Sequence, residues 1–134
     1  MDLLPTVEIA NRTGEPIAGV TMSSAPAVEE KLKRTSKPHC FVLAWIVIDV
    51  EEADTLTPIG SHLLPMVMYG HHVVFDSTGR LKQGDAVLTR FATYYDAAGI
   101  FETPDTVHIL LQQGFRKTAH MDTVRAACAG TPGS

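Results

Sequence analysis

Histidine and glutamate side chains are the groups of this sequence with the widest choice of chemistry. Six of its 134 residues are histidines; two of them, His71 and His72, are adjacent, and His108 lies in an apolar run. A histidine beside a carboxylate can transfer protons near neutral pH or bind a polar ligand. A ligand site built from such groups would draw on a small set of side chains. These candidates are His62, His71, His72, Glu102 and His108.

Metal binding is a second chemistry open to histidines, but the spacing argues against it. Zinc sites need three or four converging ligands, and neighbours in a strand, such as His71 and His72, point to opposite faces. The acidic run after residue 48 lacks the spacing of a calcium loop. The sequence also has no glycine-rich phosphate loop and no G-x-S-x-G elbow. We therefore expect no metal, no cofactor and no catalytic residue of these classes.

Five basic residues would form a patch if the sheet brought their strands together. The formal net charge of the chain is −4, whereas proteins that bind nucleic acid usually carry a basic face that neutralises phosphates. We interpret these residues as scattered charges and do not expect a nucleic-acid partner. They are Arg80, Lys82, Arg90, Arg116 and Lys117.

The candidate residues lie mostly on a series of short apolar segments between residues 66 and 111. Turn sequences separate these segments: Asp76–Gly79, Asp96–Gly99 and Thr103–Thr106. Aspartate, proline and glycine in these positions are typical of hairpin turns. The pattern predicts sequential antiparallel hairpins.

The segment Cys40–Val50 is the strongest predicted strand, because it is rich in β-branched and aromatic residues. It does not alternate with polar residues, which indicates burial on both faces and a central place in the sheet. A helix is predicted before it, over Ala25–Thr35, with Ser24 as its N-cap. A second helix is predicted over Ala119–Cys128, capped by Thr118 and packed on the sheet. We predict an α+β fold: a curled antiparallel meander sheet of five or six strands with these two helices.

The turn at Thr103–Thr106 also fixes an expected register. A two-residue turn pairs Phe101 with His108 and Glu102 with Val107. Ile100, Val107, Ile109 and Leu111 then share a face with Glu102, and we expect that face to be the core side. The opposite face, with Phe101 and His108, would bind a partner or lie under a helix.

Length and composition indicate one domain over residues 1–129 and a flexible tail over 130–134. No apolar run is long enough to span a membrane, and the first residues do not resemble a signal peptide. Two cysteines are too few for a disulfide framework. We therefore expect a cytoplasmic protein without a membrane partner.

The runs VVFDSTGRLKQGDAVLTRF, GIFETPDTVHILL and GFRK, preceded by CFVLAWIVIDV, resemble a family of short uncharacterised proteins from pseudomonads and their prophages. The resemblance covers about residues 40 to 125. The chain differs at Ala86, where the family tends to have an aromatic residue, and at His108, where tyrosine is common. The resemblance implies a bacterial, cytoplasmic setting and a mobile genetic element, and it assigns no active-site residue.

The expected function is a non-enzymatic protein-interaction module. It would act on a host or phage protein, or by self-association through a sheet edge. The alternative is a small enzyme or ligand-binding protein, with a pocket between the sheet and the 51–64 loop lined by the histidines and Glu102.

Overall fold

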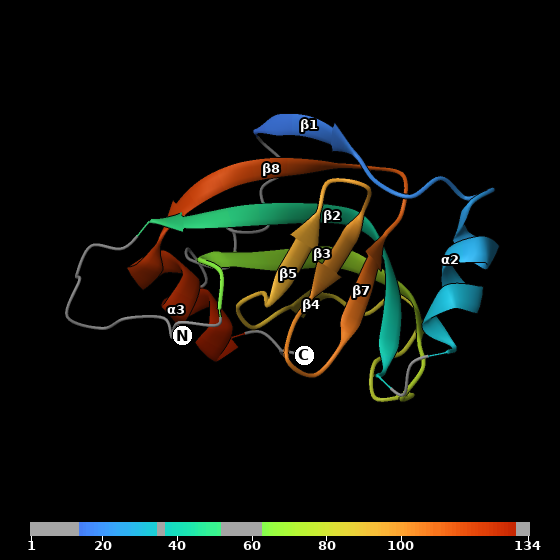
Figure 1. Ribbon diagram of the computed structural model, residues 1–134. Coiled ribbons are helices and arrows are strands. Elements are labelled where there is room, and N and C mark those ends of the chain that lie inside the picture. Colours follow the sequence, from blue (N-terminus) through green and yellow to red (C-terminus); the bar gives the residue numbers. More distant parts are fainter. Residues whose placement is uncertain (1–13, 35–36, 52–62, 131–134) are drawn as a thin grey trace.

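The computed structural model describes residues 14–34, 37–51 and 63–130. Within these ranges the protein forms a curled, eight-stranded mixed sheet, and two short helices pack against it (Figure 1). The elements in chain order are β1 (Glu15–Ala18), α2 (Ala25–Leu32), β2 (His39–Glu51), β3 (Met66–Asp76), β4 (Val87–Leu88), β5 (Tyr94–Asp96), β6 (Ile100–Glu102), β7 (Val107–Leu110), β8 (Gln113–His120) and α3 (Met121–Gly130).

Strand β2 is the centre of the sheet, as its continuous apolar run predicts. It pairs along its length with β3, in antiparallel orientation. Its other edge pairs with β7 in the first half and with β8 in the second half. Both of these pairings are parallel and the sheet has eight strands, so the predicted antiparallel meander of five or six strands is wrong, although the α+β class fits. The hairpins between β3 and β7 return the chain to β2 in the same direction that β2 itself runs.

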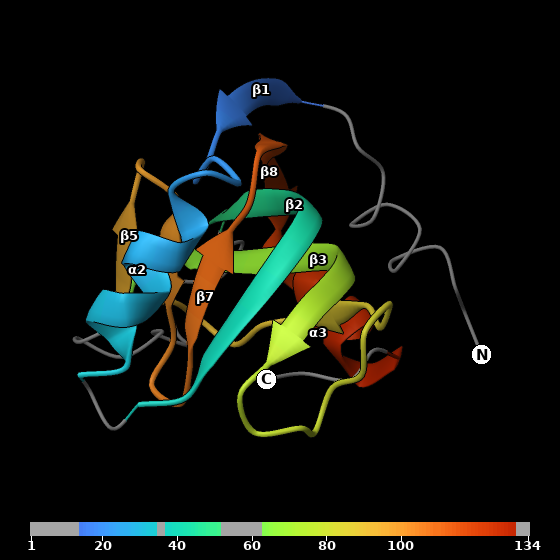
Figure 2. The same ribbon diagram turned by 90° about the vertical axis from the view of Figure 1, so that its right-hand side faces the viewer.

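The sheet curls because residues 87–96 pair with different strands at their two ends. The N–H of Ala92 donates to the carbonyl of Met66 at 3.0 Å, while the N–H of the next residue, Thr93, donates to Glu102 at 2.7 Å. The segment therefore leaves β3 and joins β6, which lies on the far side of β7. Figure 2 shows the resulting curvature around a common interior.

Three apolar clusters surround β2 and explain why it carries no polar face. The first lies in the hollow of the curled sheet and includes Val42, Trp45 and Val47. The second lies between the sheet and α3, and contains Ile46, Ile48, Val67, Val124 and Ala127, among others. The third lies under α2 and contains Phe41, Ile109 and Leu111.

A kink beside Trp45 marks the place where the pairing partner of β2 changes from β7 to β8. Ala44 and Gln112 both have positive φ, at 53° and 60°, a conformation that non-glycine residues adopt rarely. From the pair Val42–Leu110 to the pair Ile46–Phe115, the segment that joins β7 to β8 advances by one residue more than β2 does, and the carbonyl of Leu111 lies in this segment. The indole N–H of Trp45 donates to this carbonyl at 2.9 Å. The tryptophan thus satisfies the polar group that the kink leaves over.

The register predicted for the hairpin of β6 and β7 is confirmed, since Phe101 pairs with His108 and Glu102 with Val107. The face predicted as the core side is buried, but the opposite face is buried as well, so it does not offer the expected surface to a partner. Phe101, His108 and Leu110 are fully buried in the hollow of the sheet, while Ile109 and Leu111 are buried under α2. Both faces are covered because the sheet curls over one of them and α2 packs on the other.

The two predicted helices are present with shifted ends. Helix α2 ends at Leu32 rather than at Thr35, and Pro26 lies in its first turn as expected. Thr118 is not a cap, because Thr118, Ala119 and His120 continue β8 beside β2. Instead, Nδ1 of His120 accepts the N–H of Asp122 at 3.2 Å. Helix α3 packs on the sheet as predicted and extends to Gly130; the remaining tail, residues 131–134, lies outside the described ranges.

Candidate functional site

An apolar pocket of about 420 Å³ opens beside α3. Strand β3, the segment after β4, the turn between β6 and β7, and α3 each contribute to its wall. The side chains that line it are Leu63, Val67, Thr89, Arg90, Phe91, Pro104 and Val124. Val67 and Val124 also belong to the cluster between α3 and the sheet. The pocket is therefore an opening of the core onto the surface, and it adjoins the end of the 51–64 loop at Leu63.

The hydroxyl of Thr89 is the buried polar group of this wall, and its hydrogen bonds are internal. It donates to the carbonyl of Arg90 at 2.9 Å and accepts the N–H of Met68 at 2.9 Å. The residue is only 1% exposed. Because both bonds hold the segment after β4 against β3, the hydroxyl serves the fold. The interior of the pocket offers a ligand mainly apolar contact.

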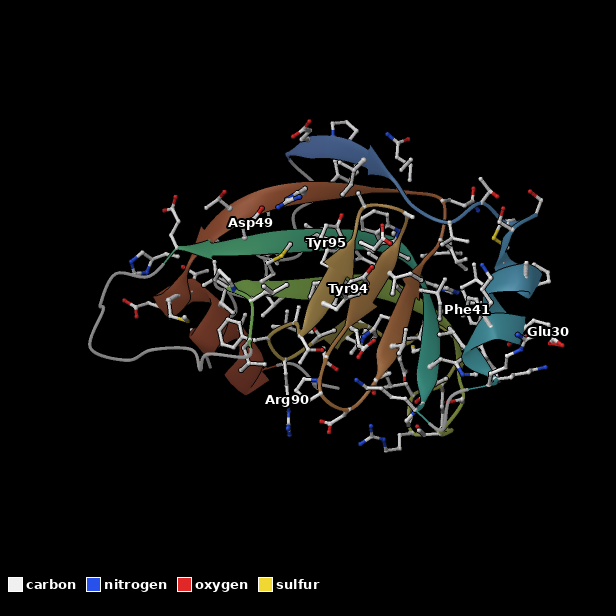
Figure 3. The ribbon with its side chains drawn as sticks, in the orientation of Figure 1. Glu30, Phe41, Asp49, Arg90, Tyr94 and Tyr95 are labelled. Atoms are coloured by element: carbon white, nitrogen blue, oxygen red, sulfur yellow. The ribbon has the colours of Figure 1, made fainter. Side chains whose placement is uncertain are left out.

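Arg90 supplies a positive charge at the rim. Its guanidinium lies 3.4 Å from a carboxylate oxygen of Asp105, and the two side chains are 73% and 53% exposed. Figure 3 shows Arg90 projecting away from the fold. An ion pair this exposed contributes little to stability. The guanidinium has five N–H donors, so it retains donors for a bound anion.

Four of the five residues predicted as a ligand site, His71, His72, Glu102 and His108, do not line this pocket. His62 lies outside the described residues. His71 and His72 are adjacent on β3, where the ring of His71 packs edge-on against Tyr69 at 4.8 Å. The pocket that the alternative hypothesis placed beside the 51–64 loop has a counterpart here, but the described part of its wall carries Thr89 and Arg90 in place of histidine and glutamate.

Glu102 and His108 have separate structural roles on neighbouring strands. The carboxylate of Glu102 accepts a hydrogen bond from the ammonium of Lys37 at 2.7 Å, with both side chains about one-third exposed or less. His108 is fully buried, and its Nδ1 lies 3.2 Å from the carbonyl of Phe101. Burial lowers the pKa of His108 to about 4, although the hydrogen bond to Phe101 opposes this shift. His108 is therefore neutral at physiological pH and enclosed by the core.

The five basic residues come from three parts of the chain, and two of them are paired with carboxylates. Arg90 pairs with Asp105, and Arg116 forms two hydrogen bonds to Asp49, at 2.7 and 3.0 Å. The guanidinium of Arg116 also lies 5.5 Å above the ring of Tyr95. The hydrogen bonds to Asp49 raise the pKa of Arg116. Arg80 and Lys82 are exposed in the loop that follows β3, and Lys117 is half-buried on β8.

A second group of polar and aromatic side chains surrounds His39 at the start of β2. The ring of His39 packs against Phe41 and Phe75, with centroids 5.9 and 5.8 Å apart. Its Nε2 is buried without a hydrogen bond and lies 3.6 Å from a carboxylate oxygen of Glu29 on α2. The group fastens α2 to the sheet, and Phe75 is the most open of its rings.

The described residues do not favour Cys40 as a nucleophile or any cluster of side chains as a metal site. The thiol of Cys40 is buried, and burial, with a smaller contribution from Asp76, raises its pKa to about 12. A thiol that is not ionised is a poor nucleophile. Within residues 14–34, 37–51 and 63–130, no three side chains of His, Cys, Asp or Glu gather as a metal site would require.

The residues of the pocket were not among the sequence candidates, apart from Arg90. Five of the lining side chains are apolar or proline, and they come from four separate parts of the chain. Such residues are interpreted from sequence as core. The turn proline, Pro104, is the one signal in the sequence, since it marks the exposed hairpin end that forms part of the rim.

One protein family accounts for most of the chain. A family described as a domain of unknown function (DUF6957) matches residues 18–126. The chain belongs to this family. The match spans β2, β3 and the described wall of the pocket, so the pocket lies within the matched region. No curated protein and no solved structure matches the chain. Neither α2 nor α3 of this DUF6957 domain has the length and apolar character needed to cross a membrane.

Proposed function

We propose that the protein is a non-enzymatic interaction module that holds a partner protein at the pocket beside α3. The observation that carries the proposal is the distribution of polarity around this pocket. Its wall is apolar, and its rim carries the opposite charges of Arg90 and Asp105. An apolar centre with a polar rim is the usual anatomy of a protein–protein contact.

The chemistry of the wall favours binding over catalysis. Acid–base catalysis needs a titratable side chain within hydrogen-bond reach of a substrate. The titratable side chain of the described wall is Arg90, which stays protonated. His108, whose pKa is strongly shifted, is enclosed in the core. The resemblance to pseudomonad and prophage proteins supports a bacterial cytoplasmic setting, and a host protein is then the first partner to test.

Site-specific photo-crosslinking in the producing cells tests this proposal. A benzophenone amino acid at Leu63 would contact a bound partner, and the same amino acid at Lys82, an exposed position of the 80–85 loop, is the control. We expect a discrete cross-linked band from position 63 that position 82 does not give. The band should disappear when Phe91→Lys places a charge in the pocket wall. A cross-link to a second copy of the chain would identify self-association at the same surface.

The size of the pocket favours one alternative. A volume of about 420 Å³ lies within the range of small-molecule sites, so an apolar small ligand is the second candidate. Absence of any cross-linked band from position 63, together with a small molecule that copurifies and is lost in Phe91→Lys, would replace the proposed function with this one.

A further inference from the structure

We infer that the partner segment recognised by this pocket presents two or three neighbouring apolar side chains followed by a carboxylate, which Arg90 binds. This inference rests on the proposed function and names the chemistry of the partner. It follows from the size of the pocket, the state of its internal polar group and the charge at its rim.

The size of the pocket sets the apolar part of the partner. A water molecule takes up roughly 30 Å³ in the liquid, and a methyl or methylene group is of similar size, so a pocket of about 420 Å³ holds a dozen or more such groups. A leucine side chain has four. A single side chain would leave much of the wall in contact with water or empty space. Two or three side chains from one face of a helix, spaced by three or four residues, would cover it.

The hydrogen bonds of the Thr89 hydroxyl argue against a polar partner side chain deep in the pocket. The hydroxyl of Thr89 already donates to Arg90 and accepts from Met68. A partner hydroxyl, amide or charge placed there would lose its hydrogen bonds to water and find few replacements. Recognition inside the pocket therefore comes from apolar burial.

The rim supplies the polar part of the recognition. Arg90 is 73% exposed, and its contact with Asp105 is long, at 3.4 Å through one nitrogen. A carboxylate can bind a guanidinium through two parallel hydrogen bonds. Asp105 is the charge that such a carboxylate must displace or share. Charge complementarity with Arg90 thus selects an acidic residue beside the apolar face.

A peptide titration followed by NMR of the Leu63, Val67 and Val124 methyl groups tests the inference. The first peptide carries leucines at positions i and i+4 of one helical face and a glutamate directly after them. In the second peptide a glutamine replaces this glutamate. We expect the glutamate peptide to bind about two- to fivefold more tightly, because the ionic hydrogen bond to Arg90 is largely exposed.

Three variants identify the source of that preference. Arg90→Gln should abolish the difference between the peptides, whereas Lys82→Gln, which removes the same charge from the exposed 80–85 loop, should retain it. Asp105→Asn should strengthen binding of the glutamate peptide about two- to fivefold, because it removes the competing carboxylate.

The outcomes separate the inference from the proposed function. Equal affinity of the two peptides, with shifts at the pocket methyls, would overturn the inference and leave the proposed function in place. Shifts caused by decanoate but by neither peptide would overturn both, because the occupant would then be a small molecule. The absence of shifts with all three probes would also overturn the inference.

Discussion

The buried, neutral state of His108 predicts a specific loss of stability in acid. Burial lowers the pKa of this imidazole from 6.5 to about 4 in the folded protein, while the unfolded chain keeps an ordinary value near 6.5. The unfolded state therefore takes up the proton first as the pH falls. The stability that depends on neutral His108 is fully present above pH 6.5, and it is lost progressively between pH 6.5 and pH 4.

The size of this loss follows from the two pKa values. Each unit of difference corresponds to about 1.4 kcal/mol, so His108 should account for a loss of about 2 kcal/mol by pH 5 and about 3 kcal/mol by pH 4. A loss of this size is a large part of the stability of a typical domain.

Urea unfolding at a series of pH values measures the effect, and His108→Phe isolates it. Phenylalanine removes the titrating group and retains a buried ring. Other carboxylates and histidines titrate in both proteins, so their contributions cancel in the difference between the two curves. We expect the free energy of unfolding of the wild type to fall relative to that of the variant by about 3 kcal/mol between pH 7 and pH 4. Parallel curves over this range would refute the assignment of His108 as a buried neutral base.

Three further predictions test the packing and the surface pairs. Gly114→Ala should lower the free energy of unfolding by about 3 kcal/mol or more, because a Cβ there would lie 2.3 Å from Trp45. Gly79→Ala is the control: a Cβ there has nothing within 4 Å, and the φ of +73° should cost only about 1 kcal/mol. Equal losses for the two variants in chemical denaturation would contradict the tight approach of Gly114 to Trp45. A double-mutant cycle with Asp49→Asn and Arg116→Gln should give a coupling energy of about 1 kcal/mol or less, because the two side chains are 37% and 40% exposed. A coupling energy of several kcal/mol would show that this ion pair is far less solvated. In a Cys128→Ser background, the thiol of Cys40 should react with a disulfide reagent at pH 8 only in denaturant, because burial raises the pKa of this thiol to about 12. Rapid reaction of the native protein would contradict the burial of Cys40.

The local features of this fold could be predicted from the sequence because each depends on residues that are close together in the chain. The apolar run of β2 predicted its central place, and the turn at Thr103–Thr106 predicted the register of β6 and β7. Turns are present at Asp76–Gly79 and Asp96–Gly99 as predicted, and their glycines have φ of +73° and +108°. Each of these features is set within about ten residues of chain.

The features that the sequence did not reveal depend on distant pairings. The parallel orientation of β7 and β8 beside β2 follows from where the chain returns after three hairpins. The core face of β7 is ambiguous from sequence because both of its faces are buried, so the strand lacks alternation. The pocket was missed for a related reason: its wall is assembled from four parts of the chain with apolar residues that resemble ordinary core.

The opening beside α3 should accept an apolar group, because the described side chains of its wall are mainly apolar. Xenon enters apolar cavities large enough to hold it, so methyl NMR under xenon pressure tests the claim without a known partner. We predict saturable shifts for the methyl groups of Leu63, Val67 and Val124, and none for Val42 and Val47, which are closely packed in the hollow of the sheet. Shifts that are absent at the pocket methyl groups, or equal to those of Val42 and Val47, would show that the opening beside α3 is not a distinct apolar pocket.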